Sequence, residues 1–177
     1  MITYCLLQDL AVSPVYVVAA TRLGLCYLQP ATSSVQGLQA LRSWLLKALK
    51  GRSYTLHLNE NHPILEQVST ELQQYFSGEL TSFSTPIDLL AGTNFQQRVW
   101  KELQRIPYGE TKIYADIATA IEQPKAYRAV GSANGQNPIC IVIPCHRVVS
   151  KRNIGGYSGG LDIKKALLLL EDSKNRS

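Results

Sequence analysis

The first 60 residues carry short apolar runs that are typical of β-strands. Their β-branched and aromatic side chains gather at residues 3–7, 15–20 and 24–28, with Ser-Pro and Arg-Leu-Gly between the runs. This spacing predicts an antiparallel meander of three strands. Apolar and polar residues then alternate over residues 54–58, which predicts a further strand.

Two longer segments have the period of amphipathic helices. Apolar residues recur three or four positions apart over residues 38–49, and Gly51 follows as a stop. The same period runs from Pro63 to Phe76, just before Gly78. We interpret both apolar stripes as core faces rather than as the lining of a cofactor pocket.

The helical period is lost between Gly78 and Gly92, where Thr, Ser and Pro become frequent. Such a change in composition is typical of a domain boundary. We therefore expect an N-terminal α/β domain at 1–86, a linker at 87–92 and a C-terminal domain at 93–177.

Three short helices are predicted after this boundary. Thr93 and Gln96 form a capping-box signature at the start of the first helix. Thr111 can cap the second helix, which extends to Ile121, and the third covers residues 125–134. The second and third helices, joined by a tight turn, resemble a helix-turn-helix, although helical hairpins are also common in proteins that never touch DNA.

Composition places the chain among ordinary globular proteins, with 177 residues, 45% hydrophobic and 18% charged. No segment has the roughly 20 apolar residues of a membrane helix, and the N-terminal residues lack the pattern of a signal peptide. These features predict a cytoplasmic protein without a membrane partner, or a nuclear one if the source is eukaryotic.

Positive charge is concentrated in the second half of the chain. Residues 1–90 hold five Lys or Arg against six Asp or Glu, whereas residues 91–177 hold thirteen against seven. This asymmetry favours a domain that faces a polyanion. A solvated basic surface would give the same counts, so charge alone leaves both interpretations open.

A candidate nucleophile follows a buried segment. Residues 139–143 form a continuous apolar run, and Pro144, Cys145 and His146 come directly after it. A Cys beside a His suggests a thiolate nucleophile, because a neighbouring base raises the ionised fraction of the thiol. Consecutive side chains seldom face each other, so we expect a water molecule to connect the two.

Glycine dominates the next loop, with four glycines in residues 155–160. This is more than a turn requires and indicates backbone that lies close against another group. A last amphipathic helix is predicted over residues 161–171, followed by a polar tail, 172–177, that frays.

The segment from Ile143 to Val149 resembles the active-site signature of the O6-alkylguanine-DNA alkyltransferases, also called methylated-DNA–protein-cysteine methyltransferases. The resemblance covers essentially the whole second half. It includes Gly92-Thr93, Phe95 to Gln97, Trp100, Ile106 to Thr111, Tyr114, Arg128 to Gly131, Asn137-Pro138, Gly155 to Gly160 and Glu171. The first half resembles the family only in length and in the order of its strands and helices.

This resemblance implies an α+β fold. Its N-terminal domain would be a ribonuclease-H-like α/β domain with an antiparallel sheet. Its C-terminal domain would be mostly helical and winged-helix-like, and would contain the helix-turn-helix. The implied function is DNA repair by a monomer, without a cofactor or an obligate protein partner and with cooperative binding on DNA left open. The protein would flip O6-alkylguanine out of duplex DNA and transfer the alkyl group irreversibly to Cys145, in a single turnover. O6-methylguanine would be the chief substrate and O4-methylthymine a second one.

The resemblance also implies roles for individual residues. Glu171 would orient His146, and His146 would take the thiol proton of Cys145 through water, while Tyr114 would donate a hydrogen bond to guanine N3. Arg128 would fill the space left by the extruded base. The implied substrate-binding positions are Asn137, Val148, Tyr157, Ser158 and Gly159. The other implied DNA-binding positions are Lys125, Ala126, Tyr127, Ala129 and Gly131, of which Tyr127 is bulky where relatives have a small residue.

Some members of the family hold a structural zinc ion in the N-terminal domain. Cys5 and Cys26 can supply half of such a site, and His57 and His62 are the remaining candidates. No histidine stands where the family pattern needs one, so we predict no metal site. Cys140 lies in the apolar run and is interpreted as an inert buried thiol.

Two other classes of protein remain open. A cysteine hydrolase would use Cys145 in repeated turnover, but nothing indicates an acyl pocket, and the helix-turn-helix would be unexplained. A DNA-binding alkyltransferase-like protein would keep the helix-turn-helix without efficient transfer, although Cys145 is present.

Overall fold

The structure is a computed structural model that describes residues 1–10 and 12–175. It divides into two compact units, one spanning Met1–Ala91 and the other beginning at Gly92. Among the described residues, no helix is both long enough and apolar enough to cross a bilayer.

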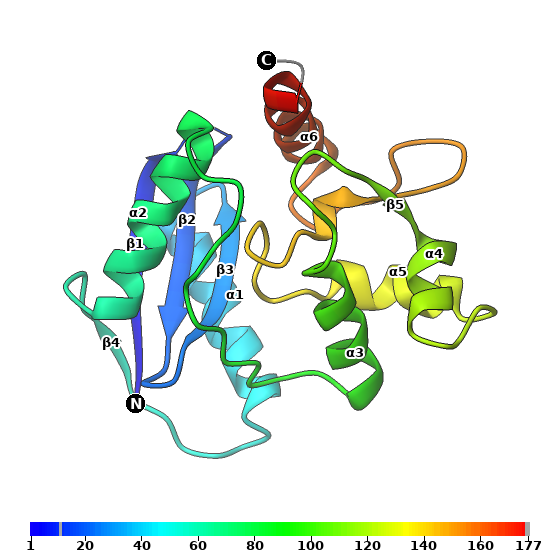
Figure 1. The fold of residues 1–177 in the computed structure, drawn as a ribbon. Helices are drawn as coiled ribbons and strands as arrows, with labels where there is room; N and C mark the ends of the chain where they lie inside the picture. The colour runs from blue at the N-terminus through cyan, green and yellow to red at the C-terminus, as the bar shows by residue number, and fades with distance from the viewer. Residues whose placement is uncertain (11, 176–177) are drawn as a thin grey trace. The chain divides into compact units, whose positions relative to one another are not determined.

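The first unit contains a four-stranded sheet in the order β3-β2-β1-β4 (Figure 1). Strands β1 (Ile2–Leu10), β2 (Ser13–Ala20) and β3 (Leu25–Ala31) form the predicted antiparallel meander. Strand β4 (Leu56–Leu58) pairs with β1 in parallel, so the expectation of an antiparallel sheet is wrong for this edge. The long connection through a helix after β3 lets the chain return in the direction of β1.

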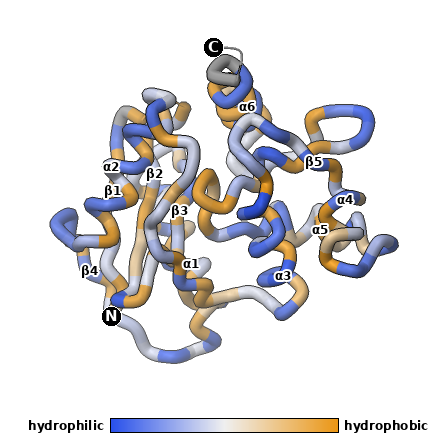
Figure 2. Tube along the Cα trace, viewed as in Figure 1, coloured by the Kyte–Doolittle hydropathy of each residue, from blue (hydrophilic) through white to orange (hydrophobic). Residues whose placement is uncertain are grey.

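Helices cover both faces of this sheet. Helix α1 (Ser34–Ala48) packs on β2 and β3, and helix α2 (Pro63–Ser77) packs mainly on β1 and β2. Leu41 and Leu45 of α1 share a core cluster with Val17 of β2. The adjacent Tyr16 faces the other side, where its ring lies 6.2 Å from that of Phe76 in α2. Residues 15–20 of β2 are therefore buried on both faces of the sheet, and most of them are hydrophobic (Figure 2).

The two helices of this unit begin and end at capping residues. Helix α1 begins four residues before the predicted apolar stripe, because the Ser33 side chain caps the backbone N–H of Gln36. Helix α2 has Pro63 in its first turn and ends at Gly78, whose φ of 76° is the left-handed conformation expected of a C-terminal glycine.

A buried carboxylate holds the segment that follows α2. Glu71 accepts hydrogen bonds from the hydroxyl and backbone N–H groups of both Ser84 and Thr85. Two residues further on, Ile87 forms a bridge to Leu25 at the start of β3. Residues 84–87 therefore pack as part of the first unit.

The second unit is mostly helical, as predicted. Helix α3 (Asn94–Leu103) starts with the predicted capping box, in which Thr93 and Gln96 each accept a hydrogen bond from the backbone of the other. In chain order, the remaining elements are β5 (Lys112–Ile113), α4 (Tyr114–Ala120), α5 (Tyr127–Gly135), the 3₁₀ helix η1 (Cys145–Arg147), β6 (Val148–Val149) and α6 (Leu161–Asn175). Strands β5 and β6 pair in parallel as a two-stranded sheet.

Two predicted boundaries in this unit are wrong. Helix α4 begins at Tyr114 and is capped by Asp116, which accepts a hydrogen bond from the backbone N–H of Ile113, so Thr111 is not the cap. Helix α6 continues to Asn175, so residues 172–175 are helical rather than a frayed tail. Residues 176–177 of the predicted tail lie outside the described residues.

Candidate active site

Two tight turns place Cys145 at the start of η1. Ile141 has a φ of 68°, and the N–H of Val142 donates to the carbonyl of Cys140 at 2.8 Å, which closes a three-residue turn. A second three-residue turn is centred on Pro144. The Asn137 side chain donates to the carbonyl of Ile143 at 2.8 Å. The apolar run is buried as predicted, and it forms turns rather than a strand.

The Cys145 thiol is enclosed, with 1% of the residue exposed. Burial raises its pKa, and four groups oppose this effect. These groups are the Asn137 side chain, the positive charge of Lys164, the backbone amide of Cys145 itself and the Tyr157 hydroxyl. A thiolate formed here is therefore stabilised by hydrogen bonds and by one buried cation.

His146 and Glu171 form a buried pair. Nε2 of His146 lies 2.8 Å from Oε1 of Glu171, and the two residues are 0% and 1% exposed. An ionised carboxylate can only accept, so Nε2 carries the proton and Nδ1 keeps its lone pair. Burial lowers the pKa of His146, although Glu171 opposes this effect, so the ring is neutral and can accept a proton.

Glu171 is also the partner of Arg147, which the sequence analysis did not assign to the site. Arg147 donates through Nε to Oε2 at 2.9 Å and through Nη2 to Oε1 at 3.0 Å, and Gly109 N–H donates to Oε2 at 3.0 Å. Burial raises the pKa of Glu171. The hydrogen bonds from His146 and Arg147 and the positive charge of Arg147 outweigh burial and lower this pKa to about 2. Glu171 therefore stays ionised.

Lys164 is a second group that the sequence analysis missed. It is 0% exposed, and Nζ donates to the carbonyls of Val148 at 2.6 Å and Gly156 at 3.1 Å. Burial lowers its pKa to about 8, while a charged Cys145 acts in the opposite direction. The available signal was its position three residues before Leu167 on the apolar face of α6, where a lysine is unusual.

Tyr114, the first residue of α4, lies against the glycine-rich loop. A Cβ at Gly155 would come within 2.9 Å of the Tyr114 hydroxyl, and the backbone of Gly156 hydrogen-bonds that hydroxyl. Burial raises the pKa of Tyr114, and the charge of Cys145 adds to this effect. The structure therefore brings Tyr114 close to the thiol.

The other predicted substrate-binding positions differ in burial. Val148 is buried and Tyr157 is partly buried, and both have contacts with the groups around Cys145. Ser158 is exposed and Gly159 is partly exposed in the loop before α6. No contact described in the structure brings Ser158 or Gly159 to Cys145.

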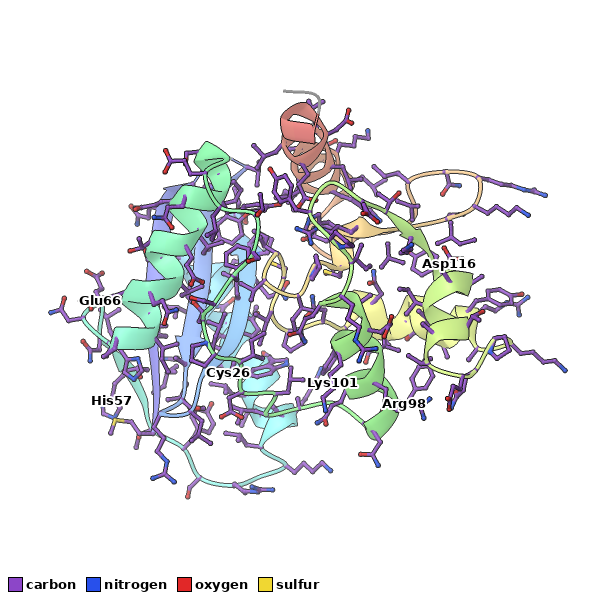
Figure 3. The ribbon with its side chains drawn as sticks, viewed as in Figure 1. Cys26, His57, Glu66, Arg98, Lys101 and Asp116 are labelled. Atoms are coloured by element: carbon purple, nitrogen blue, oxygen red, sulfur yellow. The ribbon has the colours of Figure 1, made fainter. Side chains whose placement is uncertain are left out.

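Helices α4 and α5 are fixed on α3. A guanidinium nitrogen of Arg98 donates to the carbonyl of Ile121 at the end of α4, and the Trp100 indole donates to the carbonyl of Ala133 in α5 at 2.8 Å. Figure 3 labels Arg98 and Lys101 on α3 and Asp116 on α4. This packing leaves one side of α5 exposed.

The predicted DNA-binding residues lie mainly on that exposed side. Tyr127, Arg128 and Ala129 are exposed in α5, and the Arg128 guanidinium lies 5.9 Å from the centre of the Tyr127 ring. Exposed Lys125 and partly exposed Ala126 precede α5, which begins at Tyr127 rather than at residue 125. A Cβ added at Gly131 would contact the Tyr114 ring at 3.8 Å, so this glycine faces α4.

The candidate metal ligands of the first unit do not converge. Within residues 1–10 and 12–175, no three His, Cys, Asp or Glu side chains are placed to hold a metal ion. Cys26, labelled with His57 in Figure 3, instead donates from Sγ to the carbonyl of Ala19 at 3.2 Å. Burial raises the pKa of Cys5 to about 11 and that of Cys26 to about 12.

Comparison with known proteins gives this architecture a family. Residues 14–89 match the ribonuclease-like domain of 6-O-methylguanine DNA methyltransferase, and residues 94–173 match its DNA binding domain. The chain is thus a two-domain protein with a ribonuclease-like domain followed by a DNA-binding domain. It belongs to the 6-O-methylguanine DNA methyltransferase family, which confirms the resemblance and the α+β fold predicted from the sequence.

Relatives are known at the level of sequence and of structure. A methylated-DNA–protein-cysteine methyltransferase from Methanosarcina barkeri is 51% identical over 118 residues, covering 66% of this chain and 74% of that protein. One from Mycobacterium bovis is 56% identical over 105 residues, covering 59% and 63%. The crystal structure of Mycobacterium tuberculosis O6-methylguanine methyltransferase has a TM-score of 0.80 and 37% identity, and covers 98% of this chain and 94% of its own. A structure of Mycobacterium tuberculosis OGT in complex with DNA has a TM-score of 0.80 and 36% identity, over 97% and 94%.

Proposed function

We propose that this protein repairs DNA by transferring an alkyl group from O6 of guanine to Cys145. The observation that carries the proposal is the enclosed Cys145 thiol, whose pKa Asn137, Lys164 and Tyr157 lower against the effect of burial, followed directly by His146 of the His146–Glu171 pair. The names of the relatives, methylated-DNA–protein-cysteine methyltransferases, support the same reaction.

The reaction requires that Cys145 lose its proton. Nδ1 of neutral His146 accepts that proton through a water molecule, while Glu171 stabilises the resulting imidazolium. The thiolate sulfur then attacks the alkyl carbon, the bond between that carbon and O6 breaks, and the electron pair stays with guanine. Tyr114 donates a hydrogen bond to N3, where charge develops. The S–C bond formed on Cys145 is a thioether, so each protein molecule reacts once.

The alkylated base must leave the duplex to meet an enclosed thiol. Rotating a base out of the stack costs a few kcal/mol, and a protein group that occupies the vacated space offsets part of this cost. Arg128 is the candidate, because it is exposed on α5 and its guanidinium plane can stack on a base. Lys125 and Tyr127 extend the same surface toward the phosphates.

The proposed partner is duplex DNA that carries O6-alkylguanine, with O6-methylguanine as the chief substrate and O4-methylthymine as a second. The protein would act as a monomer, without an obligate protein partner. The exposed Arg128 and Lys125 lie in the half of the chain where Lys and Arg exceed Asp and Glu, which supports a polyanionic partner.

Intact mass after incubation with a duplex that contains O6-methylguanine tests the proposal. Transfer adds one CH2 group per protein molecule, located on Cys145 by peptide mapping. Repeated hydrolysis of esters without a stable gain in mass would support a cysteine hydrolase. DNA binding without any gain in mass would support an alkyltransferase-like binding protein.

A further inference from the structure

A buried asparagine of α5 contacts the main chain of Cys145. Asn134 is 2% exposed and lies on the buried side of this helix with Val130 and Ala133. Its Nδ2 donates a hydrogen bond to the carbonyl of Cys145 at 3.2 Å. A carbonyl oxygen can only accept, so the atom that faces it is Nδ2 and the orientation of the amide is determined. Asn134 therefore connects α5 directly to the residue that carries the proposed nucleophile.

The peptide groups on both sides of the Cys145 Cα are hydrogen-bonded. The N–H of Cys145 donates to the carbonyl of Ile143 at 2.8 Å, and the carbonyl of Cys145 accepts from the N–H of Val148. These two partners are close in the chain, so their bonds shape the local turns without fixing them to a helix. Asn134 is eleven residues away and belongs to another element. Its hydrogen bond fixes this stretch of main chain to α5.

Helix α5 is itself held in place next to this contact. The carbonyl of Ala133, the residue before Asn134, accepts a hydrogen bond from the buried Trp100 indole of α3 at 2.8 Å. The same helix exposes Arg128, which is proposed to occupy the place of the extruded base. The Asn134 hydrogen bond therefore fixes the position of Cys145 relative to the proposed DNA-binding surface.

The other end of the same amide has no partner. Oδ1 of Asn134 is buried, and among residues 1–10 and 12–175 no group donates a hydrogen bond to it. An unpaired buried acceptor destabilises the folded state, and asparagine is also a poorer helix former than leucine or alanine. An apolar side chain at residue 134 would avoid both effects, since the Cys145 carbonyl would keep the N–H of Val148 as a donor. Folding stability alone therefore does not account for an asparagine at this position.

We infer that Asn134 is a positioning residue for alkyl transfer, which holds the main chain of Cys145 on α5 so that the thiolate is aligned with the alkyl carbon. This inference rests on the proposed function, in which Cys145 is the nucleophile. Displacement at carbon requires the sulfur, the carbon and the departing oxygen to lie nearly in line, and a shift of about 1 Å is enough to slow a reaction about a hundredfold. Asn134 acts through the main chain and is not among the groups that shift the pKa of the thiol. Its removal should therefore change the alignment of the thiolate and not its ionisation.

The experiment compares Asn134→Leu and Asn134→Ala with wild type in the full chain. Leucine keeps the number of side-chain heavy atoms without a donor, and alanine removes the donor without crowding. Single-turnover transfer from a duplex with O6-methylguanine is measured against DNA concentration and pH. We expect the limiting rate to fall roughly tenfold in both variants, while the DNA concentration for half-maximal rate and the pH midpoint stay at their wild-type values. A wild-type limiting rate in either variant, or a displaced pH midpoint, would overturn the inference.

Val130→Ala is the matched control, because Val130 is 0% exposed on the same side of α5 and its side chain has no polar atom. This variant is expected to unfold at a lower urea concentration than wild type and to keep the wild-type limiting rate. The Asn134 variants should show the reverse, with a smaller loss of stability and slower transfer. Equal slowing in Val130→Ala, or a greater loss of stability in Asn134→Ala than in Val130→Ala, would assign Asn134 to the fold and refute the positioning role.

Transfer by wild type is measured on the same duplex. Its absence rejects the proposed function, whereas equal transfer rates in wild type and the Asn134 variants reject only this inference.

Discussion

Arg147 hydrogen-bonds both carboxylate oxygens of Glu171, at 2.9 Å and 3.0 Å, while His146 occupies one of the same oxygens at 2.8 Å. The carboxylate that orients the proposed base is thus itself oriented by an arginine. A fork of two parallel N–H groups fixes the plane of the carboxylate, which a single contact would leave free to rotate.

Replacement of Arg147 is expected to impair both stability and transfer. Arg147→Met leaves a buried carboxylate with one cation fewer, at a cost of about 3–5 kcal/mol of unfolding free energy. Arg147→Lys keeps the charge without the fork, so we expect a smaller loss of stability and a transfer rate roughly tenfold lower. Urea unfolding and single-turnover kinetics measure the two effects, with exposed Arg152→Met as the control. An Arg147→Lys protein that transfers at the wild-type rate would contradict the orienting role.

Acid is expected to remove the contribution of Glu171 to stability. The pKa of its carboxyl falls from 4.5 to about 2 in the folded protein, so the folded state is favoured wherever the carboxyl is ionised. This stabilisation is complete above about pH 5 and is lost as the pH falls toward 2, with a total on the order of 3 kcal/mol. Unfolding free energy measured from pH 6 to 3 should fall more steeply for wild type than for Glu171→Gln. Parallel curves would show that another carboxyl causes the acid sensitivity.

Lys164 is expected to control the ionisation of Cys145. Its buried ammonium lowers the pKa of the thiol, so Lys164→Met should move the pH midpoint of methyl transfer upward and slow transfer at pH 7. An upward displacement of about one pH unit would match the loss of one nearby cation. The control is Lys165→Met, because the Lys165 side chain is 63% exposed. An unchanged midpoint in a folded Lys164→Met protein would exclude the electrostatic role.

Cys145 is expected to be the sole acceptor. Cys145→Ala and Cys145→Ser should abolish transfer while DNA binding survives, because the thiolate is needed for displacement and not for phosphate contacts. Mass spectrometry and gel-shift titration at a fixed salt concentration separate these properties. Single replacements of Cys5, Cys26 and Cys140 serve as controls and should retain transfer. Residual transfer by the alanine variant would contradict the assignment.

Arg128 is expected to matter for duplex DNA only. If its guanidinium replaces the extruded base, Arg128→Lys should slow transfer from a duplex and Arg128→Ala should slow it more, by roughly tenfold or above. Reaction with free O6-alkylated guanine should stay near wild type, since no base needs to be unstacked. Tyr127→Ala is an informative companion, because the guanidinium lies over that ring in the structure. Equal losses of transfer rate on both substrates would show that Arg128 supports the substrate-binding site or the fold rather than base extrusion.

The elements of this fold follow from the sequence where local signals agree. Thr93 with Gln96 and Gly78 behind an apolar stripe mark helix ends that the structure confirms. The first turn of α1 holds no residue of the apolar stripe, since its one large apolar side chain, Val35, is exposed, so the predicted start was late. The direction of β4 was missed because alternation is the same in parallel and antiparallel strands.

The sequence predicted the motif residues of the site but not the buried charged residues that surround them. The signature around Cys145 named the nucleophile and its neighbours, whereas the function of Lys164 depends on its distance to residues 8 and 16 positions earlier in the chain. A lysine in a helix is ordinarily a solvated charge, and only tertiary packing shows that this one is enclosed. The same holds for Arg147, whose partner lies 24 residues away.

The glycines of the loop at 155–160 differ in the space that each leaves for a side chain. A methyl group at Gly155 would come within 2.9 Å of the Tyr114 hydroxyl, and the φ of 74° there already disfavours any side chain. At Gly156 the same methyl group would meet nothing within 4 Å, and φ lies outside the left-handed range. Natural variants with alanine at residue 156 are therefore compatible with this loop, whereas alanine at residue 155 would displace the Tyr114 phenol from its present position.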